Sequence, residues 1–247
     1  MISRRHLLAA GAGLLLPGCD RLNRSEAFRE GLRAAETLNL KAQRLITSRD
    51  ALAREFSPAD ISPFFRPNGN SRPATDEYRR LAESRFADWR LRVDGLVRRP
   101  LSLSLDDIVA MPRRGQITRH DCVEGWSAIG KWTGAPLARL LDLAGLREEA
   151  RFIVFHCMDS FGARPYYESI DLVDAFHPQT ILAYGLNDRR LPIPNGAPLR
   201  LRVERQLGYK HAKFLSRIEA VASLDGIHGG RGGYWEDVGD SEWYAGI

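Results

Sequence analysis

Apolar and polar residues alternate in short stretches along most of the chain, which predicts strands mixed with short helices. Strands are expected at 89–97, 101–105, 116–122 and 152–158, and PLARLLDLAG at 136–145 predicts a helix between Pro136 and Gly145. A short helical stretch is expected at 168–176. Two strand pairs follow within 181–221, with turns at Asn187-Asp188 and Asn195-Gly196. Because strands and helices alternate irregularly, we expect an α+β domain with mixed β-sheets over residues 61–247, with the glycine-rich residues 225–247 wrapping the surface.

Residues 20–60 follow a different pattern. Their apolar residues recur near helical spacing in an otherwise polar, charged stretch, which predicts an amphipathic helical stem ahead of the domain. The apolar positions are Phe28, Leu32, Ala35, Leu38, Ala42, Leu45, Ile46 and Leu52.

The first 19 residues are typical of an export signal. Arg4 and Arg5 precede a short apolar run, AAGAGLLL, which resembles a twin-arginine signal for the export of folded proteins. The following LPGC resembles a lipoprotein processing site, so Cys19 is expected to carry a lipid anchor. The alternative is an ordinary secretory peptide with a chance arginine pair. The predicted location is the periplasm or cell envelope, tethered to the membrane.

Composition excludes some classes of function. The chain has 247 residues, 44% hydrophobic and 27% charged, as expected for a folded domain. Its net charge of +5 comes from 32 Arg and four Lys that are scattered rather than clustered. A nucleic-acid partner is therefore not expected, whereas individual arginines could bind an anionic ligand.

Cys122 is the most prominent candidate for chemistry. It ends an alternating run, with His120 before it and Glu124 and Trp126 after it, and 133–136 is expected to form a turn and helix start. Such a position at a strand end suits a ligand or a nucleophile facing a cleft.

The residues alone leave four interpretations of Cys122 open. It could form a disulfide with Cys157, bind zinc together with His120, His156 or Cys157, or act as a nucleophile with His120 as base. It could also be the single thiolate ligand of a transition metal that a cofactor holds. The last interpretation predicts an anion-binding surface elsewhere, which Asn195 to Arg200 and Gly208 to Lys213 could supply, unless this stretch is only a solvated hairpin.

Three motifs resemble a known family. DCVEGWSAIGKWTGAPLARLL, IPNGAPLRLRVERQLGYKHAKFLSRI and GYWED are similar to the molybdopterin-binding domain of the sulfite-oxidase superfamily, within the bacterial periplasmic branch of protein-methionine-sulfoxide reductase catalytic subunits. The resemblance spans about residues 60–240. It implies the sulfite-oxidase-type α+β fold, and we expect no immunoglobulin-like dimerisation domain and a monomeric catalytic subunit.

The resemblance also implies roles for individual residues. Cys122 falls on the cysteine that binds molybdenum, and the implied cofactor is molybdenum-molybdopterin. From their positions next to Cys122, Glu124 and Trp126 are our own candidates for residues beside the reacting groups; the alternatives are a solvated carboxylate for Glu124 and core packing for Trp126. Residues expected near the cofactor are Phe65, Arg66, Asn68, Cys157, Asn195, Arg200, His211, Ala212 and Lys213. Of these, His211 and Ala212 depart from the Gly-Ile-Lys pattern of the family's phosphate loop, and Cys157 stands where the relative has threonine.

The residue five positions after the cysteine bears on the substrate. Sulfite oxidases carry an arginine there in CAGNRR, whereas this chain has Ser127. A charge-assisted contact worth about 1.5–3 kcal/mol would be missing for sulfite. The resemblance therefore implies an exported enzyme for two-electron oxygen-atom transfer, with reduction of a sulfoxide-type substrate favoured over sulfite oxidation and over a non-catalytic lipoprotein. Because the chain lacks a haem-binding CxxCH, electrons are expected to be exchanged with a partner, and the resemblance implies that this partner is a membrane haem or quinone-linked protein.

Overall fold

Residues 25–239 and 241–247 are described by the computed structural model, which divides the chain into two units at Ser48 and Arg49. The predicted signal and Cys19 lie outside the described residues. The smaller unit contains helix α3 (Glu26–Ile46), whose residues are all at least partly exposed. No helix in the described part of the chain has both the length and the apolar character of a membrane span.

The predicted stem helix is therefore present but shorter than the predicted stretch 20–60. Residues 49–60 belong to the larger unit, because their backbone hydrogen-bonds to its strands. The N–H of Phe56 donates to the carbonyl of Ile117 at 2.8 Å, and the N–H of Ala53 donates to the Gln179 side chain at 2.8 Å.

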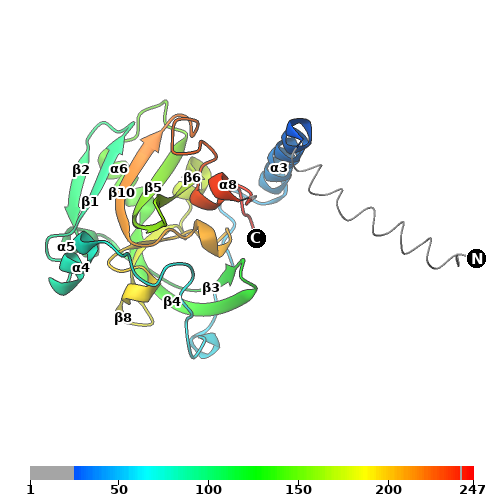
Figure 1. Ribbon diagram of the computed structural model, residues 1–247. Helices are drawn as coiled ribbons and strands as arrows, with labels where there is room; N and C mark the ends of the chain where they lie inside the picture. Colours follow the sequence, from blue (N-terminus) through cyan, green and yellow to red (C-terminus); the bar gives the residue numbers. More distant parts are fainter. Residues whose placement is uncertain (1–24, 240) are drawn as a thin grey trace, which may run out of the picture. The chain divides into compact units, whose positions relative to one another are not determined.

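The larger unit is built on two five-stranded sheets (Figure 1). The first has the strand order β2-β1-β10-β5-β6 and is mixed, since β1 pairs with β10 in parallel and the other neighbours are antiparallel. The prediction of a mixed sheet is confirmed. Its strands are β1 (Arg90–Gly95), β2 (Leu101–Ser104), β5 (Phe152–Phe161), β6 (Arg164–Asp171) and β10 (Leu215–Val221).

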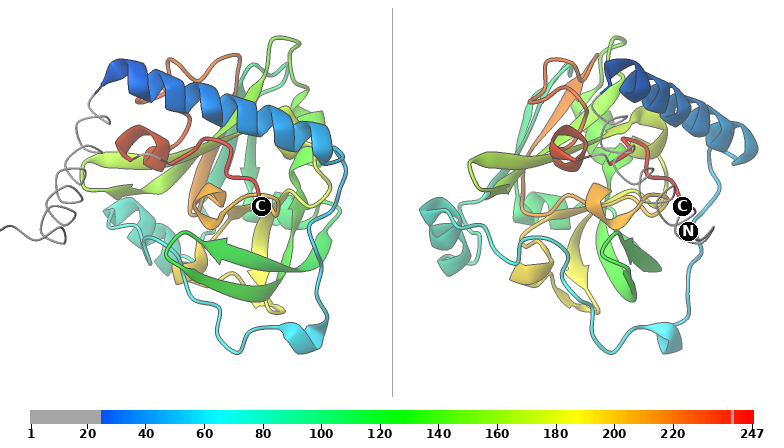
Figure 2. Two further views of the ribbon diagram at one scale, coloured as in Figure 1. Left: turned by 90° about the vertical axis from the view of Figure 1, so that its right-hand side faces the viewer. Right: turned by 45° about the vertical axis from the view of Figure 1, so that its right-hand side comes forward.

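The second sheet is antiparallel, with the order β3-β4-β7-β8, and β9 pairs with β7 on the same edge as β8, opposite β4. Buried side chains of both sheets form one cluster that includes Phe155, Leu201 and Leu215, so the main core lies between the two layers (Figure 2). The strands of this second sheet are β3 (Arg114–Cys122), β4 (Trp126–Pro136), β7 (Ile181–Leu186), β8 (Arg189–Arg190) and β9 (Arg200–Arg202).

The helices of this unit are short. Helix α6 begins after Pro136 and is followed by Gly145 at φ 66°, as the sequence predicted, and it buries Leu137, Leu140 and Leu141 against the core. The helical elements are η1 (Pro58–Asp60), α4 (Asp76–Glu83), α5 (Leu105–Val109), α6 (Leu137–Ala144), α7 (Leu172–Ala175), η2 (Ile193–Asn195), η3 (Gly208–Lys210) and α8 (Tyr234–Val238).

Two local predictions are wrong. Residues 133–136 are not a turn but the end of β4, because this segment pairs with β7. At Gly134 the two strands approach so closely that a Cβ would lie 2.3 Å from the carbonyl oxygen of Leu182. The expected helix at 168–176 shrinks to α7, because Glu168 and Ser169 pair with β5 as part of β6.

The turns were predicted with mixed success. Asn187 and Asp188 have φ of 50° and 60° and join β7 to β8, the geometry of a tight hairpin. Asn195-Gly196 does not form a second hairpin of this kind. Asn195 ends η2, Gly196 follows at φ 112°, and the chain returns to pair β9 with β7.

Candidate active site

Cys122 is the last residue of β3 and lies at the tip of a hairpin. It pairs with Trp126, the first residue of β4, and the connecting turn closes through the Gly125 N–H, which donates to the Cys122 carbonyl at 3.0 Å. Gly125 has φ of 85°, which favours glycine over other residues. The predicted position of Cys122 at the end of a strand is confirmed. Cys122 also lines a cavity.

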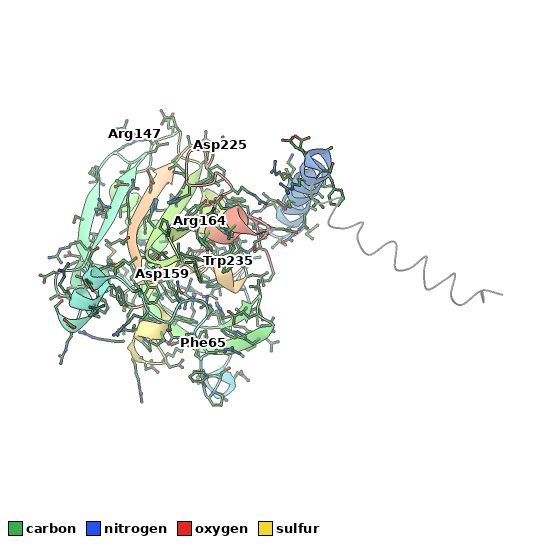
Figure 3. The ribbon with its side chains drawn as sticks, viewed as in Figure 1. Phe65, Arg147, Asp159, Arg164, Asp225 and Trp235 are labelled. Carbon is green, nitrogen blue, oxygen red and sulfur yellow. The ribbon has the colours of Figure 1, made fainter. Side chains whose placement is uncertain are left out.

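The cavity has a volume of about 250 Å³ and is walled by both sheets and the C-terminal segment. Asp159 at the end of β5 and Trp235 in α8 are two of its lining residues and are labelled in Figure 3. Segments far apart in the sequence thus meet around Cys122. The lining residues are Asn68, Gly69, Asn70, Cys122, Val123, Glu124, Asp159, Phe161, Tyr166, Tyr209, His211, Lys213, Trp235 and Ser241.

Lys213 brings a buried cation to the cavity wall. Its Nζ donates to the carbonyl of Pro194 at 2.9 Å and to the carbonyl of Asn70. Burial, reinforced by the nearby charge of Arg200, lowers the pKa of Lys213 to about 7. Burial also raises the pKa of the Asp159 carboxyl, although Asn70 donates a hydrogen bond to it at 3.0 Å. The wall therefore carries one acid and one base with shifted proton affinities.

A second buried cation, Arg200, lies behind this wall. It donates to the carbonyls of Asn195 at 2.9 Å and His211 at 3.2 Å, while its Nε has no partner. Within the described residues, no ion pair joins Arg200 to a carboxylate. Burial and the charge of Arg202 lower the pKa of Arg200 well below its ordinary value. Because a guanidinium rarely gives up its proton, an anionic group is the favourable partner for this site.

The neighbouring Arg202 is compensated. It donates to Glu204 at 2.9 and 2.6 Å and to Nδ1 of His120 at 2.9 Å. Both guanidinium groups lie over the Trp132 ring, Arg200 at 5.1 Å and Arg202 at 4.4 Å from the centroid. Trp132 thus contacts both Arg200, which has no carboxylate partner among the described residues, and Arg202, which is paired with Glu204.

Two histidines meet at this place, with ring centroids 5.1 Å apart. Since Arg202 can only donate, Nδ1 of His120 accepts and its proton is on Nε2. His211 donates from Nε2 to the carbonyl of Gln206 at 3.0 Å, which leaves its Nδ1 as an acceptor. Nε2 of His120 and Nδ1 of His211 are buried without hydrogen-bond partners among the described residues. Burial, with Arg202 next in effect, lowers the pKa of both rings well below the usual value, so both are neutral.

The upstream candidates lie around the same hairpin. Phe65 is buried edge-on against Trp132 at 5.0 Å, and its carbonyl accepts a hydrogen bond from Asn195 at 3.5 Å. Asn68 lines the cavity, and its amide donates to the Gly208 carbonyl at 3.4 Å. Arg66 lies over the Trp126 ring at 5.6 Å. The structure therefore brings this upstream segment to the site.

Glu124 and Trp126 contact each other across the tip of the hairpin. The Trp126 indole N–H donates to Glu124 at 2.9 Å, and Glu124 lines the cavity. Burial raises the pKa of the Cys122 thiol, and the backbone N–H of Glu124 opposes this by hydrogen bonding to the sulfur.

The remaining candidates lie outside the cavity wall. Ala212 is completely buried, and its carbonyl accepts a hydrogen bond from the Leu201 N–H at 2.8 Å. Cys157 lines a separate hollow with Trp89 and Ser216. Its thiol is close enough to Lys213 and Asp159 to feel their charges, but burial dominates and raises its pKa well above the usual value.

The structure bears on the alternative interpretations of Cys122. Cys122 and Cys157 are both free thiols, which excludes the disulfide among the open interpretations. His120 bonds to Arg202, and none of the hydrogen bonds given for the described residues joins it to Cys122. In residues 25–239 and 241–247, no group of three or more His, Cys, Asp or Glu side chains is arranged to hold a metal ion.

Sequence reasoning missed a set of acidic and aromatic residues next to the cavity. Asp159 and Tyr166 line it, and Tyr166 leads to a buried cluster of Glu168, Lys210 and Glu236. Tyr166 and Glu168 fall beside and within the segment predicted as a helix, and Lys210 was predicted only as part of the candidate anion-binding stretch from Gly208 to Lys213. The GYWED motif was the one signal that pointed to Glu236.

Comparison with known proteins identifies relatives. The family model described as the oxidoreductase molybdopterin binding domain matches residues 79–225. An Azospira oryzae protein, provisionally named as a protein-methionine-sulfoxide reductase subunit, YedZ1, is 38% identical over 198 residues, covering 77% of this chain and 70% of that protein. The protein-methionine-sulfoxide reductase catalytic subunit MsrP of Campylobacter jejuni is 35% identical over 144 residues, covering 53% of this chain and 48% of MsrP.

Two further comparisons agree. MsrP of Xanthomonas campestris is 33% identical over 180 residues, covering 68% of this chain and 54% of that protein. The chain thus spans about half the length of both MsrP proteins. The sulfane dehydrogenase SoxCD of Paracoccus pantotrophus superposes with a TM-score of 0.51 at 22% identity, over 55% of this chain and 39% of that one, and supports the fold alone.

Proposed function

Because the chain belongs to the family of oxidoreductase molybdopterin-binding domains, we propose that it is the catalytic unit of a molybdenum enzyme that removes an oxygen atom from a sulfoxide-type substrate. The observation that carries this proposal is the position of Cys122, which lines a cavity together with Lys213 and His211, in front of the unpaired Arg200. A thiol in the same cavity wall as a buried lysine, with a buried arginine behind that wall, suits a metal held by an anionic cofactor.

The residues present fit such a cofactor. Arg200 is fully buried without a carboxylate partner among the described residues, its Nε is free of hydrogen bonds, and Lys213 is held nearby with a lowered pKa. Two cations in this condition favour a phosphate group over water. When bound, molybdenum-molybdopterin supplies the two-electron oxygen-atom chemistry.

The protein's own residues have distinct tasks in this proposal. The Cys122 thiolate is the protein ligand of the metal, at a hairpin tip fixed by the Gly125 turn. Asn195 and Arg200 hold the pterin, and the loop of His211, Ala212 and Lys213 holds the phosphate. Neutral His120 and His211 offer one donor and one acceptor next to this loop.

The charge of the cavity favours a neutral substrate over sulfite. Its lining contains two carboxyl groups, Glu124 and Asp159, and one lysine. Ser127, at the position of the sulfite oxidases' arginine, is instead hydrogen-bonded to Asp121 at 2.5 Å. A dianion would meet carboxylates without the extra guanidinium, whereas a neutral sulfoxide avoids this repulsion. In this proposal Glu124, which lines the cavity, contacts the substrate, and Trp126 supports it through the hydrogen bond from its indole N–H to Glu124.

The remaining proposals concern the setting of the enzyme. The twin-arginine-like residues Arg4 and Arg5 and the LPGC sequence at Cys19 support export to the periplasm and a lipid anchor. Electrons come from a membrane haem or quinone-linked partner. Labelling with a radioactive fatty acid and fractionation of wild type and Cys19→Ala test the anchor, and a wild-type protein that stays soluble and unlabelled would rule it out.

The activity is tested with full-length protein purified from a host that makes molybdopterin. Molybdenum content is measured first, followed by the reduction of methionine sulfoxide with a chemically reduced viologen as electron donor. Oxidation of sulfite with an artificial acceptor is assayed in parallel. We expect reduction of methionine sulfoxide, with none in Cys122→Ala. Molybdenum-loaded protein that oxidises sulfite and leaves sulfoxides unchanged would replace the proposed substrate, and wild type without molybdenum would refute the enzyme.

A further inference from the structure

Lys210 lies between two carboxyl groups in the interior of the larger unit. Its Nζ is 2.7 Å from Glu168 Oε2 on β6 and 2.5 Å from Glu236 Oε1 on α8, which lies beside β6 (Figure 1). The side chains of all three are at most 1% exposed. One lysine and two carboxylates would leave a net charge of −1 in a place that water does not reach, which is very unfavourable. One bound proton makes the cluster neutral.

The position of that proton follows from the oxygen atoms. Glu236 Oε2 is buried without a hydrogen-bond partner among the described residues, and Glu168 Oε2 is buried with the 2.7 Å ion pair to Lys210 Nζ but without a hydrogen bond. Both converge on Gly233, where a Cβ would lie 2.1 Å from Glu236 Oε2 and 2.5 Å from Glu168 Oε2. A proton shared between these oxygens gives both a partner. Burial, with Glu236 next in effect, raises the pKa of Glu168 well above its usual value.

The cluster reaches the cavity through Tyr166. This residue lines the cavity, its hydroxyl is 3.2 Å from Glu168 Oε1, and it donates to the Tyr209 carbonyl at 2.7 Å. A hydroxyl can accept one proton while it donates its own, so Tyr166 can connect the carboxyl pair with an acceptor in the cavity. The titratable and charged groups that face Glu168 come from β5, β6, η3 and α8: Cys157, Tyr166, Tyr167, Lys210 and Glu236.

We propose that Glu168 and Glu236, bridged by Lys210, form a proton-storing site that delivers a proton to the cavity through Tyr166. Removal of oxygen from a sulfoxide consumes two electrons and two protons and yields a thioether and water. The electrons come from the external donor. The pair supplies one proton: after the Glu168 carboxyl group turns to carry the shared proton on Oε1, it protonates the Tyr166 hydroxyl as that hydroxyl protonates the departing oxygen. The cluster, then at −1, regains a proton from cavity water by the reverse route, and the second proton comes from solvent.

The stored proton is tested by infrared spectroscopy of the full-length protein at neutral pH. The carbonyl stretch of a protonated, buried carboxyl group is expected in wild type. It should disappear in Glu168→Gln and in Glu236→Gln, since the single remaining carboxylate then balances Lys210. The matched control is Glu204→Gln, which removes a buried carboxylate that is already neutralised by Arg202 and should leave the band in place. A spectrum without the band, or a band that survives both substitutions, overturns the proposal.

Delivery to the cavity is tested with the metal-loaded enzyme. Tyr166→Phe and Glu168→Gln should each lower kcat at least about tenfold, with little change in KM, and should flatten the pH profile of kcat and change its solvent isotope effect. Variants that keep the wild-type pH profile and isotope effect overturn the relay. The delivery step rests on the proposed function, whereas the protonated pair does not. Failure of the proposed function is recognised separately, as wild-type enzyme that does not reduce methionine sulfoxide.

Discussion

Arg200 and Arg202 lie on the same indole ring, that of Trp132, yet their electrostatic environments differ. Arg202 has a carboxylate partner in Glu204, whereas no ion pair is found for Arg200 among the residues that the structure describes. In the cofactor-free protein, the Arg202 guanidinium is therefore neutralised by the fold. The Arg200 guanidinium is the one that the proposed function assigns to an anionic ligand.

This difference predicts that substitution of Arg202 mainly lowers the free energy of unfolding, whereas substitution of Arg200 mainly weakens cofactor binding. Arg202→Met strands Glu204 in the core and should lower the free energy of unfolding by about 3–5 kcal/mol. Arg200→Met removes a charge without a partner and should cost at least about 2 kcal/mol less, while the purified protein loses bound molybdopterin. Urea denaturation of cofactor-free protein and fluorescence assay of extracted pterin measure the two effects. Equal losses of stability would contradict the assignment of Arg200 to ligand binding.

Lys213 predicts a pH dependence of stability without cofactor. Its pKa is about 7 in the folded protein and near 10.5 in the unfolded chain, so between these values the unfolded state binds more protons. The contribution of Lys213 to the free energy of unfolding therefore rises as pH increases from about 7 to about 10. The difference in free energy of unfolding between wild type and Lys213→Met, measured by thermal unfolding, should rise across this range. Lys131→Met, at a partly exposed ion pair with Asp188, is the control, and its difference from wild type should show no such rise.

The two free thiols predict different results for cysteine substitutions. Cys122→Ser should abolish molybdenum retention, because the metal loses its protein ligand. Cys157→Ser, in the hollow beside Trp89, should retain molybdenum. Metal analysis of both purified variants decides this, and circular dichroism checks that both are folded. Loss of molybdenum from Cys157→Ser alone would reverse the assignment.

The close approach of Gly208 to His120 can be tested by a double-mutant cycle. A Cβ on Gly208 would lie 2.5 Å from His120 Nε2, so Gly208→Ala should destabilise the fold by about 1–3 kcal/mol. His120→Ala makes room for the added methyl group, and the double variant should be more stable than the sum of the single effects indicates. Strictly additive free energies from urea denaturation would argue against this contact.

How far the sequence predicts this protein depends on how local each signal is. Helix α6 was predicted because Pro136, Gly145 and the leucines between them are neighbours in the chain. The end of β4 was missed, because glycine and proline at 133–136 indicate a turn until β7 supplies a partner.

The same distinction applies to the site. Cys122, His211 and Lys213 were found through short motifs, and all three line the cavity. The Glu168–Lys210–Glu236 cluster was missed, because each member alone looks like an ordinary surface charge. Their complete burial becomes visible only when β6, η3 and α8 come together.

The parallel pairing of β1 with β10 has a consequence for biosynthesis. Arg92 lies opposite Arg217, so the first strand of the sheet waits for the last strand before it has both neighbours. The cavity likewise forms only when early and late parts of the chain are both present, since its lining includes Asn68 and Cys122 as well as Lys213 and Trp235. Pairing over such long loops is slow compared with local hairpins. A receptive site therefore exists only after the residues from Asn68 to Trp235 have left the ribosome, so the proposed cofactor can bind only from that point on.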